Sequence, residues 1–127
     1  MVSMATGLEN LWIYKLAEDL EIEVHNITKL FPRDEIYRSV DQLRRSSCSV
    51  SNNIAESYHK GSIKEKTRFL NIAKGEAEET KMNVHRSSRK AFVPKEKADY
   101  LTEKYTVLIK GIYAYQKFLM LQELKTK

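Results

Sequence analysis

The sequence has few of the residues that interrupt helices or build disulfide frameworks. It contains one cysteine, four glycines and two prolines in 127 residues. A lone Cys48 cannot form an internal disulfide, and so little Gly and Pro argues against a turn-rich β fold. No apolar run reaches the roughly 18 residues of a membrane span, and Met1–Gly7 lacks the basic start and apolar stretch of a signal peptide. We therefore expect a cytoplasmic protein with no membrane partner.

The sequence also lacks the motifs of known active sites. His25, His59 and His85 lie on different segments, and none has a second His or Cys at metal-ligand spacing. The glycines are isolated rather than gathered in a phosphate-binding loop, and the serines lack recognisable His and acidic partners. Cys48 lies among serines and is interpreted as a small packing residue. We expect no enzyme activity, no catalytic residue, no metal and no cofactor.

Apolar residues recur at helical spacing along most of the chain. Three breaks interrupt this pattern, at residues 31–34, 58–61 and 92–94. The predicted helices cover residues 8–30, 37–58, 63–91 and 94–124. Short connections between such helices favour an all-α protein, an antiparallel up-down-up-down four-helix bundle formed as a single domain over residues 1–127. The alternative is a looser three-helix array with a detached terminus.

Local signals refine the ends and faces of these helices. Thr6 with Glu9, and Ser62 with Glu65, have the spacing of a capping box. The second helix is rich in serine and asparagine, which are indifferent helix formers, so we expect close tertiary packing to hold it. The fourth helix carries two apolar rows where one would suffice for a bundle, and this surplus predicts self-association.

Charge is distributed unevenly along a chain whose net charge is +5. Residues 1–36 sum to about −4, residues 37–93 to about +6 and the remainder to about +3. In the third helix the bases lie almost opposite the apolar stripe, and only Glu78 interrupts them. Such a face is either a solvated surface or a phosphate-binding surface for nucleic acid. The candidate phosphate contacts are Arg44, Arg45, Lys64, Arg68, Lys74, Lys81, Arg86 and Arg89.

The second helix also contains the most notable carboxylate, Glu56. It has two interpretations: it organises a site with Arg45 or Asn53, or it forms a structural salt bridge or hydrogen-bond network. We favour the structural interpretation, because buried polar groups generally need such partners.

Several stretches resemble one known family. The most specific lie in the second helix, as Gln42-Leu43-Arg44-Arg45, Ser49-Val50 and Asn53-Ile54-Ala55-Glu56. Weaker stretches are Leu11–Lys15, Phe31-Pro32, Ser62, Lys64-Glu65 and Arg68–Gly75. Together they resemble the bacterial four helix bundle protein family, also known as ribosomal RNA intervening-sequence proteins or S23 ribosomal proteins. Ser51, Asn52 and Ser57 depart from the Pro, Ser and Gly that members commonly carry there.

This resemblance implies a bundle fold and, commonly, a ring-shaped homopentamer. Some relatives are encoded inside insertions of large ribosomal RNA genes. Distant relatives are accessory proteins of diversity-generating retroelements that bind a reverse transcriptase and nucleic acid. The family has no established enzymatic activity, so the resemblance implies much more about fold than about function.

Two functional hypotheses follow. In the first, a non-enzymatic homo-oligomer, expected to be a pentamer, binds RNA or DNA through the bases of the second and third helices. In the second, the chain is a protein-interaction scaffold whose acidic first helix, with Glu18 and Glu21, meets a basic face of a neighbouring subunit or partner. A reverse transcriptase is a further possible partner, implied only by the distant relatives.

Overall fold

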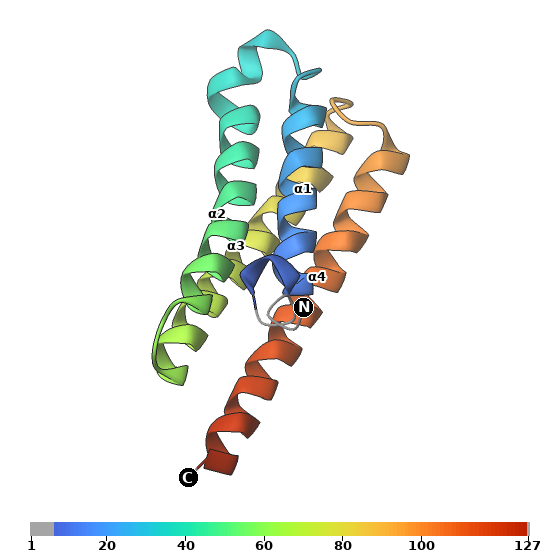
Figure 1. Cartoon of the computed structure of the whole chain (residues 1–127). Helices are drawn as coiled ribbons and strands as arrows, with labels where there is room; N and C mark the ends of the chain where they lie inside the picture. The colour runs from blue at the N-terminus through green and yellow to red at the C-terminus, as the bar shows by residue number, and fades with distance from the viewer. Residues whose placement is uncertain (1–6, 127) are drawn as a thin grey trace.

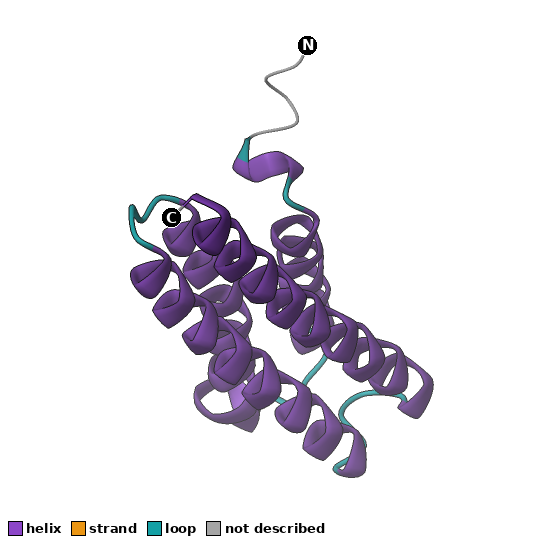
Figure 2. Ribbon diagram, turned by 90° about the horizontal axis from the view of Figure 1, so that it is seen from below, coloured by secondary structure: helices purple, strands orange, loops and turns teal. Residues whose placement is uncertain are grey.

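The computed structural model describes residues 7–126 and consists of helices joined by short loops over that range (Figures 1 and 2). The long helices are α1 (Trp12–Thr28), α2 (Asp41–Tyr58), α3 (Ile63–Arg89) and α4 (Lys95–Thr126). Three single-turn elements accompany them: the 3-10 helices η2 (Leu8–Asn10) and η3 (Arg33–Glu35), and the π-helix η4 (Ile36–Val40). No helix in residues 7–126 is both long and apolar enough to cross a membrane.

The long helices alternate in direction and pack around one core, which confirms the predicted up-down-up-down bundle (Figure 1). Each helix packs against the next along the chain, and α1 returns to contact α4. The contact between α2 and α3 is the most extensive, and that between α1 and α4 is the least extensive of these four. Every long helix contributes fully buried apolar side chains, among them Ile13, Leu43, Leu70 and Tyr105.

Close packing of α2 follows from its small polar residues, as the sequence predicts. Ser46, Ser47 and Ser57 are each at most 3% exposed. The hydroxyl of Ser46 lies 2.6 Å from that of Thr80 on α3, in a buried hydrogen bond between the two helices. Thr80 is itself fully buried and donates to the carbonyl of Glu76 at 2.8 Å. Short side chains thus bring the helices together, and their hydroxyl groups are satisfied by hydrogen bonds.

The helix boundaries differ from the predicted ones at several ends. A 3-10 turn and then Leu11 in extended conformation precede α1, so the first α-helix begins at Trp12. The predicted capping residue Thr6 lies outside the described residues. A π-helix turn at Ile36–Val40 precedes α2, so the second α-helix begins at Asp41 rather than at Tyr37. The predicted cap at Ser62 is confirmed, because its side chain accepts a hydrogen bond from the amide of Glu65.

A left-handed turn ends α3 two residues earlier than predicted. Ala91 has a φ of 66°, a conformation in which helices commonly terminate. The amide of Phe92 donates to the carbonyl of Ser87 at 2.9 Å, and that of Ala91 donates to Ser88 at 2.9 Å. These two bonds form the paired closure of a Schellman motif, with Ala in the place that glycine usually takes. The ring of Phe92 then packs against Phe31 at 5.4 Å between centroids.

Helix α4 is the longest element, at 32 residues, and its C-terminal part extends past the other helices (Figure 1). Several large apolar side chains of this part are more than half exposed: Tyr113, Phe118, Met120, Leu121 and Leu124. Nearer its middle, Gly111 allows the ring of Trp12 on α1 to lie directly against the α4 backbone. The absence of a side chain at Gly111 therefore sets how closely α1 approaches α4.

Replacing Gly111 by alanine should destabilise the bundle. The added Cβ would lie 2.5 Å from Cζ2 of Trp12 and 3.0 Å from Cγ2 of Ile13. Relieving such an overlap in a packed contact costs about 1–3 kcal/mol, which urea unfolding would detect. Gly75 is the matched control, because a Cβ there meets nothing within 4 Å. Gly75→Ala should stabilise α3 by about 0.5–1 kcal/mol. Equal effects of the two substitutions would contradict the proposed contact.

Candidate nucleic-acid interface

The predicted phosphate-binding bases do not lie on one continuous face. They fall into separate locations because neighbouring helices pack on both flanks of α3 and α2. Arg44 and Arg45 illustrate this separation, since adjacent residues point about 100° apart around a helix.

Arg44 is directed toward the end of α1. Its Nε donates to the hydroxyl of Thr28 at 2.8 Å, and its guanidinium reaches the carbonyl of His25 at 3.5 Å. Thr28 in turn donates to that same carbonyl at 2.7 Å. Cations near a helix C-terminus satisfy free carbonyl groups and favour the helix dipole. Arg44 therefore has a structural role that its position in a basic stretch did not reveal.

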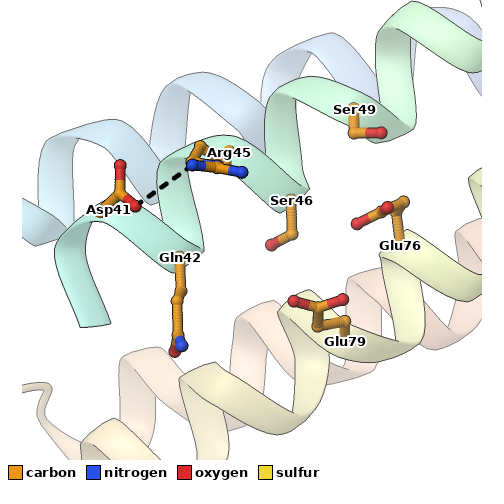
Figure 3. A pocket seen from close by; sticks show the side chains of 7 residues that line it. All are labelled: Asp41, Gln42, Arg45, Ser46, Ser49, Glu76 and Glu79. Atoms are coloured by element: carbon orange, nitrogen blue, oxygen red, sulfur yellow. Dashed lines mark ion pairs between the residues drawn. The ribbon is translucent and has the colours of Figure 1, made fainter. Parts of the chain in front are cut away.

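Arg45 borders a polar groove between α2 and α3 (Figure 3). It forms an exposed ion pair with Asp41 at 3.7 Å. The groove has a volume of about 640 Å³ and also contains the carboxylates of Glu76 and Glu79. Neither of these two glutamates forms an ion pair with a base in residues 7–126. The surroundings of Arg45 are thus more acidic than basic.

The carboxylates of this groove correct the prediction that only Glu78 interrupts the basic face. Glu78 and Glu79 are both exposed, and Glu76 is half-buried at the margin with α2. They separate the bases near the start of α3 from those near its end. Arg68 and Arg86 are 18 residues apart, which corresponds to roughly 27 Å along a helix. A nucleic acid that followed α3 along its length would therefore pass over negative charge.

At the start of α3, Lys64 and Arg68 are both exposed, and Arg68 lies beside an aromatic ring. The guanidinium of Arg68 is 4.5 Å from the centroid of Phe69, and the ammonium of Lys60 is 5.1 Å from it. The cations contact the ring of Phe69, so this ring is not a free platform for stacking a base. Lys60 also forms an ion pair with Glu56 at 3.2 Å.

In the middle of α3, Lys74 and Lys81 are half-buried and lie toward α4 rather than on the exposed face. The ammonium of Lys74 is 5.2 Å from the centroid of Tyr113 on α4. Lys81 lies 3.9 Å from Glu78 in an ion pair, and it lines a shallow hollow with Thr102 of α4. These two lysines belong to the boundary between α3 and α4.

The end of α3 gathers three bases around one hollow. Arg86, Arg89 and Lys90 line a depression of about 320 Å³, and all three are exposed. Arg86 donates to the side-chain oxygen of Asn83, and none of the three forms an ion pair with a carboxylate within residues 7–126. Sequence reasoning missed Lys90, although it directly follows Arg89 at the end of the same helix. Arg86 and Arg89 are thus two predicted bases that lie together on one concave surface, where Lys90 joins them.

The surroundings of Glu56 and Cys48 indicate structural roles for both residues. Glu56 forms an ion pair with Lys60 at 3.2 Å, which supports its interpretation as a salt-bridge residue. No group of three or more His, Cys, Asp and Glu side chains in residues 7–126 is arranged to hold a metal ion. Burial, followed by the charge of Glu21, raises the pKa of the Cys48 thiol. A raised pKa disfavours the reactive thiolate, which agrees with a packing role for Cys48.

The two adjacent arginines of α2 should respond differently to substitution. Arg44→Gln removes the bonds to Thr28 and the His25 carbonyl and should lower the free energy of unfolding by about 1–2 kcal/mol. Arg45→Gln removes one exposed ion pair and should change it by less than about 0.5 kcal/mol. Urea unfolding of both variants measures the difference. A larger loss at Arg45 would contradict these assignments.

Glu76 should make stability depend on pH. Burial, with a further contribution from Glu79, raises the pKa of its carboxyl. The folded chain therefore binds this proton more tightly than the unfolded chain, and the charged form costs stability above the raised pKa. Glu76→Gln should raise the thermal midpoint at pH 7, and the gain should vanish at pH values below the carboxyl's ordinary range. Glu103→Gln, at an exposed position of α4 without an ion pair in residues 7–126, is the control. A lower midpoint for Glu76→Gln at pH 7 would refute this assignment.

Comparison with known proteins agrees with the fold and the sequence stretches described above. The chain is similar to a crystal structure of a protein of unknown function from the S23 ribosomal protein family of Bacteroides thetaiotaomicron, with 22% identity and a TM-score of 0.76. The similarity covers 83% of this chain and 95% of that one. No curated protein matches significantly. The family model described as 23S rRNA-intervening sequence protein matches residues 9–114, and the chain therefore belongs to this family.

Proposed function

We propose that this protein is a non-enzymatic homo-oligomer that binds nucleic acid, with RNA as the favoured ligand. The hollow formed by Arg86, Arg89 and Lys90 carries this proposal. A phosphate group is the natural occupant of a concave surface with three cations and no ion-paired carboxylate. The description of the family refers to an element of ribosomal RNA, which makes structured RNA the first ligand to test.

The proposed contact surface is smaller than the full set of predicted bases. Arg44 is engaged with α1, and Lys74 and Lys81 lie at the boundary with α4. One hollow on one subunit would bind a phosphate backbone weakly. In an assembly with cyclic symmetry, however, every subunit presents the same end on the same side, so the hollows of all subunits would form one basic rim.

Self-association is supported by the apolar C-terminal part of α4. A helix that is apolar on all sides is normally buried, yet Leu121 and Leu124 are 58% and 67% exposed. Contiguous exposed apolar surface of this kind commonly marks an interface between proteins. We propose a cyclic homo-oligomer, with the five subunits that the family resemblance implies.

The second candidate function, a protein-interaction scaffold, is supported by the unpaired acidic residues. Glu18 and Asp19 on α1 and Glu79 on α3 are exposed and without ion pairs in the described part of the chain. Glu21 is no longer part of this proposal, because it is half-buried and accepts a hydrogen bond from Ser51 at 2.7 Å. In a scaffold, acidic and basic surfaces would be covered by protein and RNA affinity would be negligible.

Removing the three bases of the hollow should weaken RNA binding. The variant Arg86→Gln/Arg89→Gln/Lys90→Gln should bind RNA about tenfold or more weakly at moderate salt. The slope of the logarithm of its affinity against the logarithm of the salt concentration should be shallower than that of the wild type by about 2. Mobility shift with structured RNA at several salt concentrations measures both quantities.

The matched variant is Lys60→Gln/Lys64→Gln/Arg68→Gln, which removes the same charge at the other end of α3. It should retain most of the affinity. An equal loss in both variants would refute the assignment to the hollow. Wild-type protein with no salt-sensitive RNA affinity at micromolar concentration would refute nucleic-acid binding and leave the scaffold.

A further inference from the structure

A groove between α3 and the C-terminal part of α4 has largely apolar walls. Its volume is about 460 Å³, and Tyr113, Met120, Leu121 and Leu124 are among the residues that line it. Gln116 closes the base of the groove and is 5% exposed. Its amide donates to the side chain of Asn71 at 2.9 Å and to the carbonyl of Thr67 at 3.3 Å. The floor is thus fixed by hydrogen bonds, while the apolar walls stay open to solvent.

The groove carries positive charge at its margin. The ammonium groups of Lys74 and Lys117 lie over the ring of Tyr113, at 5.2 and 5.4 Å from its centroid. Neither lysine forms an ion pair with a carboxylate in residues 7–126. The groove is therefore suited to an apolar surface that also carries acidic side chains. Two copies of the groove would not suit each other, because their lysines would repel.

The exposed stripe of α1 has this complementary character. Trp12 and Ile22 are 53% and 55% exposed, and Asp19 lies between them on the same side of the helix. Glu18 is adjacent and also exposed, and neither acid forms an ion pair in the described residues. Lys15 lies on the same face. Because Glu9 is also exposed, the summed charge of Glu9, Lys15, Glu18 and Asp19 is still negative. Trp is a frequent anchor residue of protein interfaces.

The two surfaces lie on different sides of the bundle. α1 packs against α2 and α4, where Trp12 lies against the α4 backbone at Gly111, and makes no extensive contact with α3, so the stripe lies on the α1 side of α4 and the groove on its α3 side. A contact between them must therefore join two molecules. We infer that the α1 stripe of one copy, with Trp12, Asp19 and Ile22, docks in the α3–α4 groove of a second copy. This inference rests on the self-association in the proposed function and specifies its contact as head-to-tail, the type that closes into rings.

Two complementary variants of the full chain test this contact. The groove variant Leu121→Glu/Leu124→Glu keeps its α1 stripe, and the stripe variant Glu18→Lys/Asp19→Lys keeps its groove. All four positions are exposed, so both variants should retain the helical circular dichroism and thermal midpoint of the wild type. Size exclusion with light scattering should give an oligomer for the wild type and a monomer for each variant. An equimolar mixture should associate again, because one intact stripe and one intact groove remain.

Two controls match these changes at positions outside the contact. Leu30→Glu/Tyr37→Glu places acids on the exposed apolar residues beyond the end of α1, and Glu96→Lys/Glu103→Lys reverses two exposed charges of α4. Both should keep the wild-type mass. If the wild type assembles while the groove and stripe variants also keep its mass, or if their mixture stays monomeric, this contact is overturned and self-association stands. A monomeric wild type would overturn self-association as well, whereas the RNA mobility shift reports on the basic hollow independently.

Discussion

The close approach of α2 to α3 is the constraint on which the other features of this bundle depend. Serine and alanine at the contact allow it, and the buried bond between Ser46 and Thr80 fixes the relative position of the two helices. Larger side chains would separate the helices, because interiors of proteins are packed at nearly crystalline density. Polar contacts of this kind also specify one arrangement, since a shift along either helix would break the hydrogen bond between these two buried hydroxyl groups.

This packing explains how the surface charges are divided. With α2 on one flank of α3 and α4 on the other, one face of α3 remains in solvent. The bases that point to the flanks contact neighbouring side chains, as Lys74 contacts Tyr113. The carboxylates of Glu76 and Glu79 lie at the groove with α2. Exposed positive charge is thereby concentrated near the two ends of the helix, and the middle is acidic.

Much of the fold is predictable from the sequence, because apolar periodicity and capping residues are local properties. The four helices and the cap at Ser62 belong to this class. The arrangement of the bases was less predictable, because periodicity gives the buried side of a helix but not which neighbour covers each flank. In the sequence, Arg44 and Arg45 are equivalent neighbouring bases. Only the packing of α1 against α2 shows that the end of α1 lies beside Arg44. Lys90 was missed because its position depends on how the helix ends rather than on helical spacing.

The left-handed turn at Ala91 has a consequence for the energetics of any anion at the end of α3. A residue with a side chain in this conformation costs roughly 1–2 kcal/mol, and the bonds from Ala91 and Phe92 to the preceding turn, with the packing of Phe92 on Phe31, offset this cost. The backbone beneath Arg89 and Lys90 is therefore already ordered in the free protein. Its conformational entropy is lost when the chain folds, so an incoming phosphate would need to restrict only the side chains.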